Sequence, residues 1–229
     1  MRLKQVIKSV VYPLYEKRLF ARLDFSQTPH HIGVILDGNR RWSKANPSDG
    51  GDQSTSRGHQ AGAEKILDLL DWCEATQVKV VTLWLLSNQN LSRTAEELKP
   101  LLEIIGTSVS KLAAQKRWQI RPVGSMELLP VELRNTLEKA AHETKDISGI
   151  VVNVAIGYGG RNEIVDAVKS LILSGQASGK SVTEIAEGVD IEEISKHLYT
   201  AGLPDPDLVI RTSGEQRLGG FLLWQSAHS

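Results

Sequence analysis

The feature that most constrains the fold is a regular alternation of short, almost continuously apolar runs with segments of helical periodicity. The longest apolar run, residues 78–86, directly follows a segment over 60–77 in which Ile66, Leu70 and Cys73 recur at helical spacing. Strands that are apolar on both faces are typical of parallel sheets, because crossover helices cover both sides. The sequence therefore predicts an α/β fold: a single domain of about six mainly parallel strands flanked by helices.

The predicted elements are apolar segments separated by turn residues. Strands are expected over residues 31–36, 78–86, 119–123, 150–156, 208–212 and 221–225. Helices are expected over residues 60–77, 130–145 and 161–173, with a further helix from Thr94 and two short ones from Ser181 and Asp190. Each of those three starting residues is followed three positions later by a glutamate, which is the spacing of a capping box: Glu97, Glu184 and Glu193.

Residues 1–28 form a separate amphipathic helical region in this interpretation, and residues 29–229 form the domain. The helical region mixes Val6, Val10, Leu14 and Leu19 with Lys4, Lys8, Lys17, Arg18 and Arg22. Two interpretations stay open: the helix packs on the domain, or it contacts a membrane surface. No apolar run reaches the roughly 18 residues of a membrane-spanning helix, and charges interrupt every candidate signal-peptide core. We therefore expect a cytoplasmic protein, with peripheral contact at the inner face of the cell membrane under the second interpretation.

The charge balance and the cysteine content exclude several classes of protein. The 229 residues include 27 Lys and Arg against 27 Asp and Glu, so the formal net charge is zero. General nucleic-acid binders carry a basic excess, so no nucleic-acid partner is expected. The single cysteine, Cys73, excludes a disulfide framework and a thiolate zinc site.

Polar residues follow the first predicted strand at once, in the order Asp37, Gly38, Asn39, Arg40, Arg41 and Trp42. Gly38 permits a tight turn, and the guanidinium groups of Arg40 and Arg41 offer paired donors that suit phosphate oxygens. An acidic residue belongs in such an anion site if Asp37 shares a divalent cation with the phosphate. The alternative is an ordinary Asp-Gly turn flanked by solvated arginines.

Three further strand ends carry similar residues, in the segments 87–93, 157–161 and 211–220. Each alone is equally typical of a polar turn, but ligands of open parallel sheets bind outside the carboxyl ends of the strands. The convergence of four such ends predicts a site for two phosphate groups beside an apolar wall rich in Leu and Trp. The glycine spacing matches neither a Walker A loop nor a dinucleotide fingerprint, so a nucleotide is not indicated. His59 is the only histidine in a promising context, and a ligand role and a satisfied helix-start side chain both stay open.

Five segments together resemble the cis-prenyltransferases, which are the undecaprenyl diphosphate synthase family, and most closely the short-chain Z-isoprenyl diphosphate synthases of actinobacterial type. The segments are residues 31–42 (HIGVILDGNRRW), 58–62 (GHQAG), 85–93 (LLSNQNLSR), 153–161 (NVAIGYGGR) and 207–217 (DLVIRTSGEQR). The resemblance implies a prenyltransferase that condenses isopentenyl diphosphate with an allylic diphosphate to give a Z-configured product. It also implies Mg²⁺ as cofactor and a homodimer.

The resemblance implies a role for each matching residue. Asp37 would handle the metal and assist departure of the allylic diphosphate, and Asn90, positioned by Ser87, would help to remove a proton. The allylic diphosphate would lie against Gly38, Asn39, Arg40 and Arg41, with Trp42 and His59 beside it. The isopentenyl diphosphate would lie against Arg93, Arg211, Arg217, Leu218 and Gly219. The substrate-binding motif of the second strand end also contains Asn88, Gln89 and Leu91.

The chain departs from the family pattern in several places. Segment 43–56 is long and polar where the family often has another diphosphate-binding arginine, which Arg57 would have to replace. Gln89 and Leu91 stand where Glu and Trp are common. The chain stops at Ser229, just before a metal-binding Glu of the family, so we expect either a fragment without its C-terminal tail or impaired metal binding. Leu85 replaces a small residue of the long-chain members, which predicts a short product of roughly ten to twenty carbons.

Three functions stay open on the sequence. The first is an active cis-prenyltransferase, which the retention of Asp37, Asn90, Arg211 and Arg217 favours. The second is a non-catalytic or impaired partner subunit of the same fold that binds diphosphate, which the missing Glu favours. The third, a nucleotide- or sugar-phosphate-binding α/β protein, requires that the resemblance be set aside.

Overall fold

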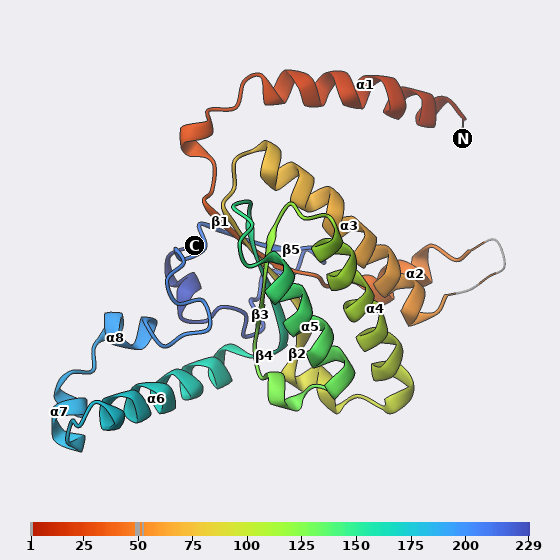
Figure 1. Ribbon diagram of the computed structural model, residues 1–229. Coiled ribbons are helices and arrows are strands. Elements are labelled where there is room, and N and C mark those ends of the chain that lie inside the picture. Colours follow the sequence, from red (N-terminus) through yellow and green to blue (C-terminus); the bar gives the residue numbers. More distant parts are fainter. Residues whose placement is uncertain (1, 49–50, 52) are drawn as a thin grey trace.

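A parallel sheet forms the centre of the computed structural model, which describes residues 2–48, 51 and 53–229 (Figure 1). Its strands are β1 (His31–Ile35), β2 (Val80–Ser87), β3 (Gln119–Val123), β4 (Val151–Tyr158) and β5 (Leu208–Arg211). The order across the sheet is β3-β4-β2-β1-β5, and each neighbouring pair is parallel. The predicted α/β class, with one domain and a parallel sheet flanked by helices, is confirmed.

The strand count is five in the described residues, and the predicted sixth strand over 221–225 is wrong. Gly219, Gly220 and Leu222 have φ angles of 62°, 95° and 44°, which an extended strand does not allow. Phe221 and Leu222 are fully buried, so the apolar run reflects burial of an irregular segment. Gln225 fixes the end of this segment, because its amide nitrogen donates to the buried carboxylate of Glu163 at 3.0 Å.

Eight helices are described: α1 (Arg2–Phe20), α2 (Asn39–Ala45), α3 (Thr55–Ala75), α4 (Ala95–Ala114), α5 (Val131–Thr144), α6 (Gly160–Ala177), α7 (Val182–Glu187) and α8 (Ile191–Ser195). Short 3₁₀ turns are η1 (Phe25–Gln27), η2 (Asn88–Ser92), η3 (Met126–Leu128) and η4 (Gln225–His228). Helices α3, α4 and α5 pack side by side on one face of the sheet and close the larger core (Figure 1). A smaller core of aromatic residues lies on the other face, under the 218–225 segment.

Two of the three predicted helix caps are confirmed. Ser181 and Glu184 form a reciprocal capping box at α7, and the Asp190 carboxylate accepts from the backbone N–H of Glu193 at α8. The prediction for α4 is wrong, because the side chain of its N-cap residue, Thr94, accepts no helical N–H. The Thr94 hydroxyl binds the carboxylate of Glu96 instead.

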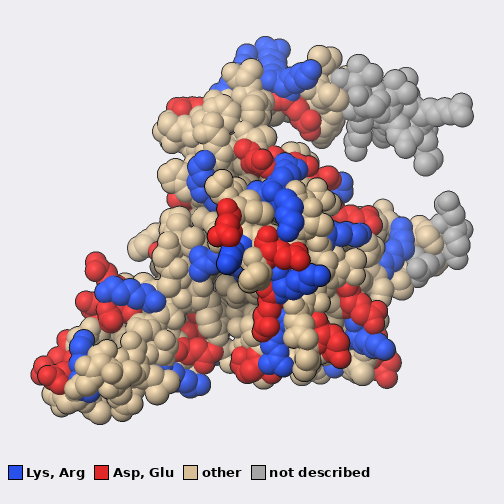
Figure 2. All heavy atoms as spheres, in the orientation of Figure 1, with Lys and Arg blue, Asp and Glu red and all other residues tan. Residues whose placement is uncertain are grey.

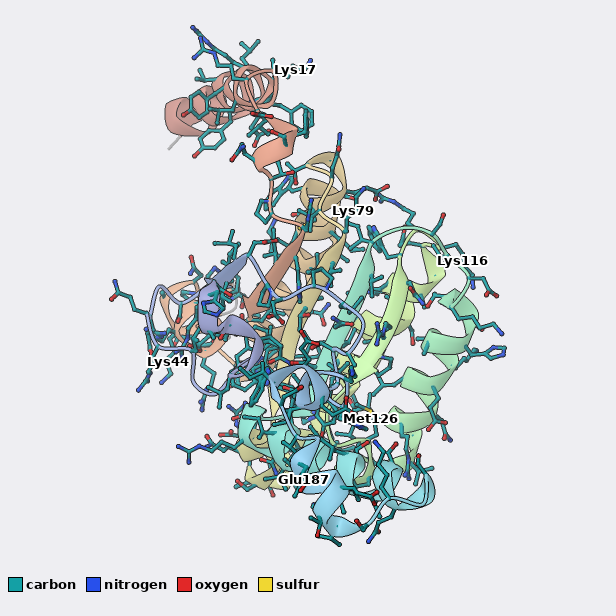
Figure 3. The ribbon with its side chains drawn as sticks, turned by 90° about the vertical axis from the view of Figure 1, so that its left-hand side faces the viewer. Lys17, Lys44, Lys79, Lys116, Met126 and Glu187 are labelled. Atoms are coloured by element: carbon teal, nitrogen blue, oxygen red, sulfur yellow. The ribbon has the colours of Figure 1, made fainter. Side chains whose placement is uncertain are left out.

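Helix α1 lies apart from the sheet in Figures 1 and 3. The described side chains of its second half are exposed, including Tyr12 at 56% and Leu14 at 65%. Residues 11–20 are therefore not buried against the domain in this structure. In the part of the chain that the structure describes, no helix has both the length and the apolar character needed to cross a bilayer.

His31 anchors the amino end of the sheet through a chain of hydrogen bonds. The Asn153 amide donates to the Thr82 hydroxyl at 2.9 Å, and the hydroxyl donates to His31 Nε2 at 2.8 Å. His31 Nδ1 then donates to the carbonyl of Pro204 at 2.7 Å. Burial lowers the pKa of His31, against the opposing effects of the Pro204 carbonyl and of Asp207 and Asp205. The imidazole is therefore neutral in the folded protein near pH 7.

This histidine makes the fold sensitive to acid. A histidine whose pKa is depressed by folding binds its proton more readily in the unfolded chain, so stability is lost as pH falls below the unfolded pKa of about 6.5. We expect the urea midpoint to fall between about pH 7.5 and about pH 5.5, and His31→Gln to show a shallower fall. The exposed His142→Gln variant is the control and should follow the unmodified chain. Equal slopes for all three proteins would contradict this prediction.

Candidate active site

The carboxyl ends of β1, β2 and β5 border a cavity of about 600 Å³, which α2, α3 and α4 enclose. Its polar end contains Asp37, Gly38, Asn39, Arg40, Arg41, Lys44, His59, Asn90, Arg93, Arg211, Glu215 and Arg217. Its apolar end contains Leu36, Ala63, Ile66, Leu85, Leu101, Ile104 and Ile105. In Figure 3, Lys44 lies well away from Lys17 of α1, so the cavity and α1 occupy different parts of the molecule.

A second hollow of about 420 Å³ adjoins this cavity and shares its polar residues Asp37, Asn90, Arg93, Arg211 and Arg217. It adds Trp84, Ser87, Gln89 and Gly219 to the lining. Leu36 and Leu85 also line both hollows, so the two hollows adjoin along the carboxyl ends of β1 and β2. The polar groups shared by both hollows could therefore contact two ligands at once.

Asp37 is the carboxylate at the junction of the two hollows. Its Oδ2 accepts from Arg211 Nε at 3.0 Å and from Arg211 Nη2 at 2.6 Å, and its Oδ1 accepts from the backbone N–H of Gly38 at 2.7 Å. Partial burial raises the pKa of Asp37, but the hydrogen bonds from Arg211, Ser213 and Gly38 outweigh it and hold the pKa below its usual value. The group is therefore an anion at neutral pH, with part of its surface facing the cavity.

Glu215 gathers three arginines at the rim of the cavity. Its carboxylate lies 3.4 Å from Arg41, 3.3 Å from Arg211 and 2.9 Å from Arg217. The side chains of Arg41 and Arg217 are 63% and 78% exposed, so these two pairs contribute little to stability and exchange partners at small cost. An incoming anion could therefore draw both guanidinium groups away from Glu215.

Arg93 and Arg40 both line the cavity, and their positive charges repel each other. Burial, and then the positive charge of Arg40, lower the pKa of the Arg93 guanidinium, while Glu97 acts in the other direction. Two cations held together in a partly buried wall repel each other, and a bound anion would relieve that repulsion. This wall is therefore suited to a strongly charged anion such as a diphosphate.

His59 offers a buried hydrogen-bond donor to the same wall. Burial lowers its pKa, the charges of Arg93 and Arg40 lower it further, and Glu97 opposes them, so the ring is neutral near pH 7. The Asn39 amide nitrogen lies 3.4 Å from His59 Nδ1, which makes Nδ1 the acceptor and places the proton on Nε2. The buried Nε2 has no protein partner among the described residues. The ligand interpretation of His59 fits this arrangement better than that of a satisfied side chain.

The glycines around His59 explain how α2 and α3 come so close. A Cβ on Gly58 would lie 2.1 Å from the carbonyl oxygen of Asn39, and one on Gly62 would lie 2.6 Å from its amide oxygen. No larger residue fits either contact, so these glycines allow Asn39 to reach His59. Gly38, with φ of 95°, allows the chain to turn from β1 into α2.

Four predicted substrate-binding residues line neither hollow: Trp42, Asn88, Leu91 and Leu218. Trp42 is 43% exposed and carries the guanidinium of Arg57 at 5.1 Å from its ring centroid. Arg57 also donates to the carbonyl of Asn46 and lines neither hollow in this structure. Leu91 packs on the larger core, and the amide of Asn88 faces Gly157 and Gly159. The rest of the 43–57 segment includes 49, 50 and 52, which lie outside the described residues.

The glycine-rich segment 157–161 was predicted to be a fourth side of the phosphate site, and this is wrong for both hollows. A Cβ on Gly160 would lie 2.7 Å from the carbonyl oxygen of Gly220 and 2.8 Å from Leu223. The backbone N–H of Gly160 donates to that same carbonyl at 2.9 Å. The glycines therefore allow the C-terminal segment to pack against the start of α6.

Lys44 and Glu215 belong to the cavity although the sequence pattern assigned no role to either. Glu215 had a usable signal, because it lies between Arg211 and Arg217 in a segment rich in cations. Lys44 has no comparable signal, since a basic residue at the end of a short helix is typical of a solvated surface.

Over the face shown in Figure 2, Lys and Arg side chains alternate with Asp and Glu side chains.

The comparisons with known proteins agree with this geometry. The family model described as "Putative undecaprenyl diphosphate synthase" matches residues 35–229. "Isoprenyl transferase 1" of Streptomyces avermitilis is 52% identical over 229 residues, which is 100% of this chain and 87% of the relative. "(2Z,6E)-farnesyl diphosphate synthase" of Thermobifida fusca is 53% identical over 98% of this chain and 86% of its own length.

One solved structure has the same fold as this chain and a lower sequence identity to it than the two relatives above. It is the lavandulyl diphosphate synthase from Lavandula x intermedia in complex with dimethylallyl diphosphate, with a TM-score of 0.76 and 30% identity. The match covers 86% of this chain and 83% of that one. With the family model matching most of its length, the chain belongs to the undecaprenyl diphosphate synthase family of cis-prenyltransferases.

Proposed function

We propose that this chain condenses isopentenyl diphosphate with an allylic diphosphate and forms a short, Z-configured prenyl diphosphate. The observation that carries the proposal is a single cavity with five arginines at one end and aliphatic side chains at the other. An amphiphile with an anionic head and a hydrocarbon tail matches both ends. The names of relatives near 50% identity, among them a (2Z,6E)-farnesyl diphosphate synthase, support this substrate class.

In this proposal the two diphosphates lie on the two sides of Asp37. Arg40, Arg41 and His59 bind the allylic diphosphate, with Gly38 and Asn39 shaping the turn around it. Arg93, Arg211, Arg217 and the backbone near Gly219 bind the isopentenyl diphosphate. The groups at the junction, Asp37 and Asn90, then face both substrates.

Mg²⁺ fits this site through Asp37 and the substrate together. Among the described residues no three His, Cys, Asp or Glu side chains form a metal cluster. Magnesium ions in phosphate-transfer sites are commonly held by one or two carboxylates and by substrate phosphates, so a lone Asp37 beside the arginine wall is adequate. When bound, the ion would neutralise charge that develops on the departing diphosphate.

The reaction breaks the C–O bond of the allylic diphosphate, and the departing oxygen keeps the electron pair. The double bond of isopentenyl diphosphate attacks the allylic carbon to form the new C–C bond, and the proton that the isopentenyl unit loses passes to the departing diphosphate. Prepositioned arginines stabilise the growing charge on the leaving group, while the aliphatic end excludes water from the cationic carbon. Asn90 is held for its part in proton removal by Ser87, whose hydroxyl accepts from the Asn90 backbone N–H at 3.1 Å.

Incorporation of labelled isopentenyl diphosphate tests this function. In the presence of Mg²⁺ and an allylic primer, the chain should convert the label into a product that extracts into organic solvent after dephosphorylation. A folded protein that binds both diphosphates without incorporation would favour the non-catalytic partner subunit instead.

Leu85 is proposed to limit the length of the product. It lines the apolar end of the cavity, which Ile66, Leu101 and Ile105 close. Replacing Leu85 by Ala removes bulk from this wall, so we expect products longer by at least one isoprene unit. Chromatography of the dephosphorylated products measures the change, and Leu128→Ala at an exposed position of η3 is the control. An unchanged product from Leu85→Ala would contradict the assignment.

We further propose a homodimer in the cytoplasm, with peripheral contact of α1 at the inner face of the cell membrane. Support for self-association comes from exposed apolar side chains on α6, including Val165, Ile172 and Leu173. Support for membrane contact comes from Tyr12, Leu14 and Tyr15 of α1, which are exposed next to Lys17 and Arg18. Sedimentation equilibrium and vesicle flotation test these two proposals separately.

A further inference from the structure

The hydroxyl of Thr212 bridges the two strands at the point where they separate. The last residue pair of the β1–β5 ladder is Ile35 with Arg211. Beyond it, the Thr212 backbone N–H still donates to the carbonyl of Ile35 at 3.1 Å. The Thr212 side chain continues the link between the strands. Its Oγ1 accepts from the backbone N–H of Asp37 at 3.0 Å and donates to the backbone carbonyl of Asp37 at 2.7 Å.

One side chain therefore contacts both backbone groups of Asp37, whose N–H also donates to the backbone carbonyl of Ile35 at 3.0 Å. A hydroxyl has one donor and two acceptor positions. Thr212 directs one acceptor and its donor to Asp37, and the Ile35 carbonyl is a second, longer acceptor at 3.3 Å. The adjacent backbone is also in close contact, since a Cβ on Gly38 would lie 3.6 Å from the Cα and Cβ of Ser213. Thr212 and Ser213, which line neither hollow, hold the backbone of residue 37 through these contacts.

The Thr212 side chain does not itself reach the substrates. It lines neither hollow, whereas Asp37 lines both. Arg211 binds the Asp37 carboxylate. The position of that carboxylate also depends on the backbone of Asp37, because movement of the backbone would move the side chain with it. We propose that Thr212 is a positioning residue, which fixes the backbone of Asp37 so that its carboxylate stays aimed at the departing diphosphate; this inference rests on the proposed role of Asp37.

The test compares three variants of the full chain. Thr212→Val keeps the shape and removes both hydrogen bonds, and groups that orient a catalytic or metal-binding residue typically contribute about ten- to a hundredfold to activity. We expect Thr212→Val to lower kcat by that factor and to leave KM for isopentenyl diphosphate within about threefold of the unmodified chain. Thr212→Ser keeps the hydroxyl and should restore kcat. Thr136→Val removes a comparable hydroxyl-to-carbonyl bond on α5 and should change neither parameter.

A second measurement does not depend on activity. Amide hydrogen exchange, followed by NMR, should show faster exchange at Asp37 in Thr212→Val and an unchanged rate in Thr212→Ser.

The Asp37→Asn variant distinguishes failure of the proposed role of Asp37 from failure of the inference on Thr212. If Asp37→Asn turns over as fast as the unmodified chain, the proposed role of Asp37 fails. If Asp37→Asn is impaired while Thr212→Val keeps full kcat and normal exchange, only the inference on Thr212 is overturned. A loss that Thr212→Ser shares would equally overturn it, because the hydroxyl would then be irrelevant.

Discussion

Replacing Asp37 by Asn is expected to lower kcat by about a hundredfold to a thousandfold, with little change in the unfolding temperature. The substitution keeps the shape of the side chain and its contact with the Gly38 N–H, but it removes the negative charge. That charge is proposed to hold Mg²⁺ against the departing diphosphate, so its loss acts on the transition state more than on substrate binding. Steady-state kinetics with both substrates at saturation measure the effect.

Asp68→Asn is the matched control for this prediction. Asp68 lies on α3, where its carboxylate binds Lys65 at 2.7 Å on the exposed surface. The same loss of one negative charge there should leave kcat unchanged. An Asp37→Asn protein with kcat within about threefold of the unmodified chain would contradict the role given to Asp37.

Replacing Arg211 by Leu is expected to lower kcat/KM for isopentenyl diphosphate by about a hundredfold or more, because removing one prepositioned donor from a charge-stabilising site typically costs about a hundredfold to a thousandfold in rate. The Arg211 side chain is only 16% exposed and makes two hydrogen bonds to Asp37. It also donates to the backbone carbonyl of Arg217 at 2.6 Å and so shapes the 211–217 loop. The variant therefore loses a cation that is proposed to bind the substrate, a partner of Asp37 and a loop contact together.

Arg211→Lys should fall between the unmodified chain and Arg211→Leu. Lysine keeps the charge, but its single ammonium group does not reproduce the planar set of donors that contacts Asp37 and Arg217 simultaneously. Arg134→Leu on α5, away from the cavity, is the control and should keep normal kinetics. Equal activity of the Arg211→Leu and Arg134→Leu proteins would contradict the proposed role of Arg211 in substrate binding.

The sheet could be predicted from the sequence because parallel strands buried on both faces leave nearly continuous apolar runs. Residues 119–123 coincide with β3, and the other four strands lie within two residues of their predicted limits. The apolar run over 221–225 resembles a buried strand in sequence, but it is apolar because an irregular segment is buried there. Phe221 is buried against Trp84, with ring centroids 5.2 Å apart, in a segment whose positive φ angles no apolar pattern reveals.

The polar end of the site could also be predicted, since strand order places the ends of β1, β2 and β5 next to one another. Segment 157–161 was misassigned because glycine permits close backbone contact with any neighbour, whether a phosphate or another part of the chain. The position of Trp42 outside both hollows could not be predicted, because its direction on α2 depends on how that short helix packs on α3. The two hydrogen bonds of Thr212 depend on side-chain geometry across strands that are 175 residues apart in sequence.

The product formed by the unmodified chain shows which condensation the cavity carries out. The protein would be incubated with isopentenyl diphosphate, Mg²⁺ and, in separate reactions, dimethylallyl, geranyl or farnesyl diphosphate, and the products identified by mass spectrometry and NMR. Our account predicts a short-chain prenyl diphosphate whose newly formed double bond has the Z configuration. A new double bond in the E configuration, or no condensation by a folded protein with any of the three primers, would contradict it.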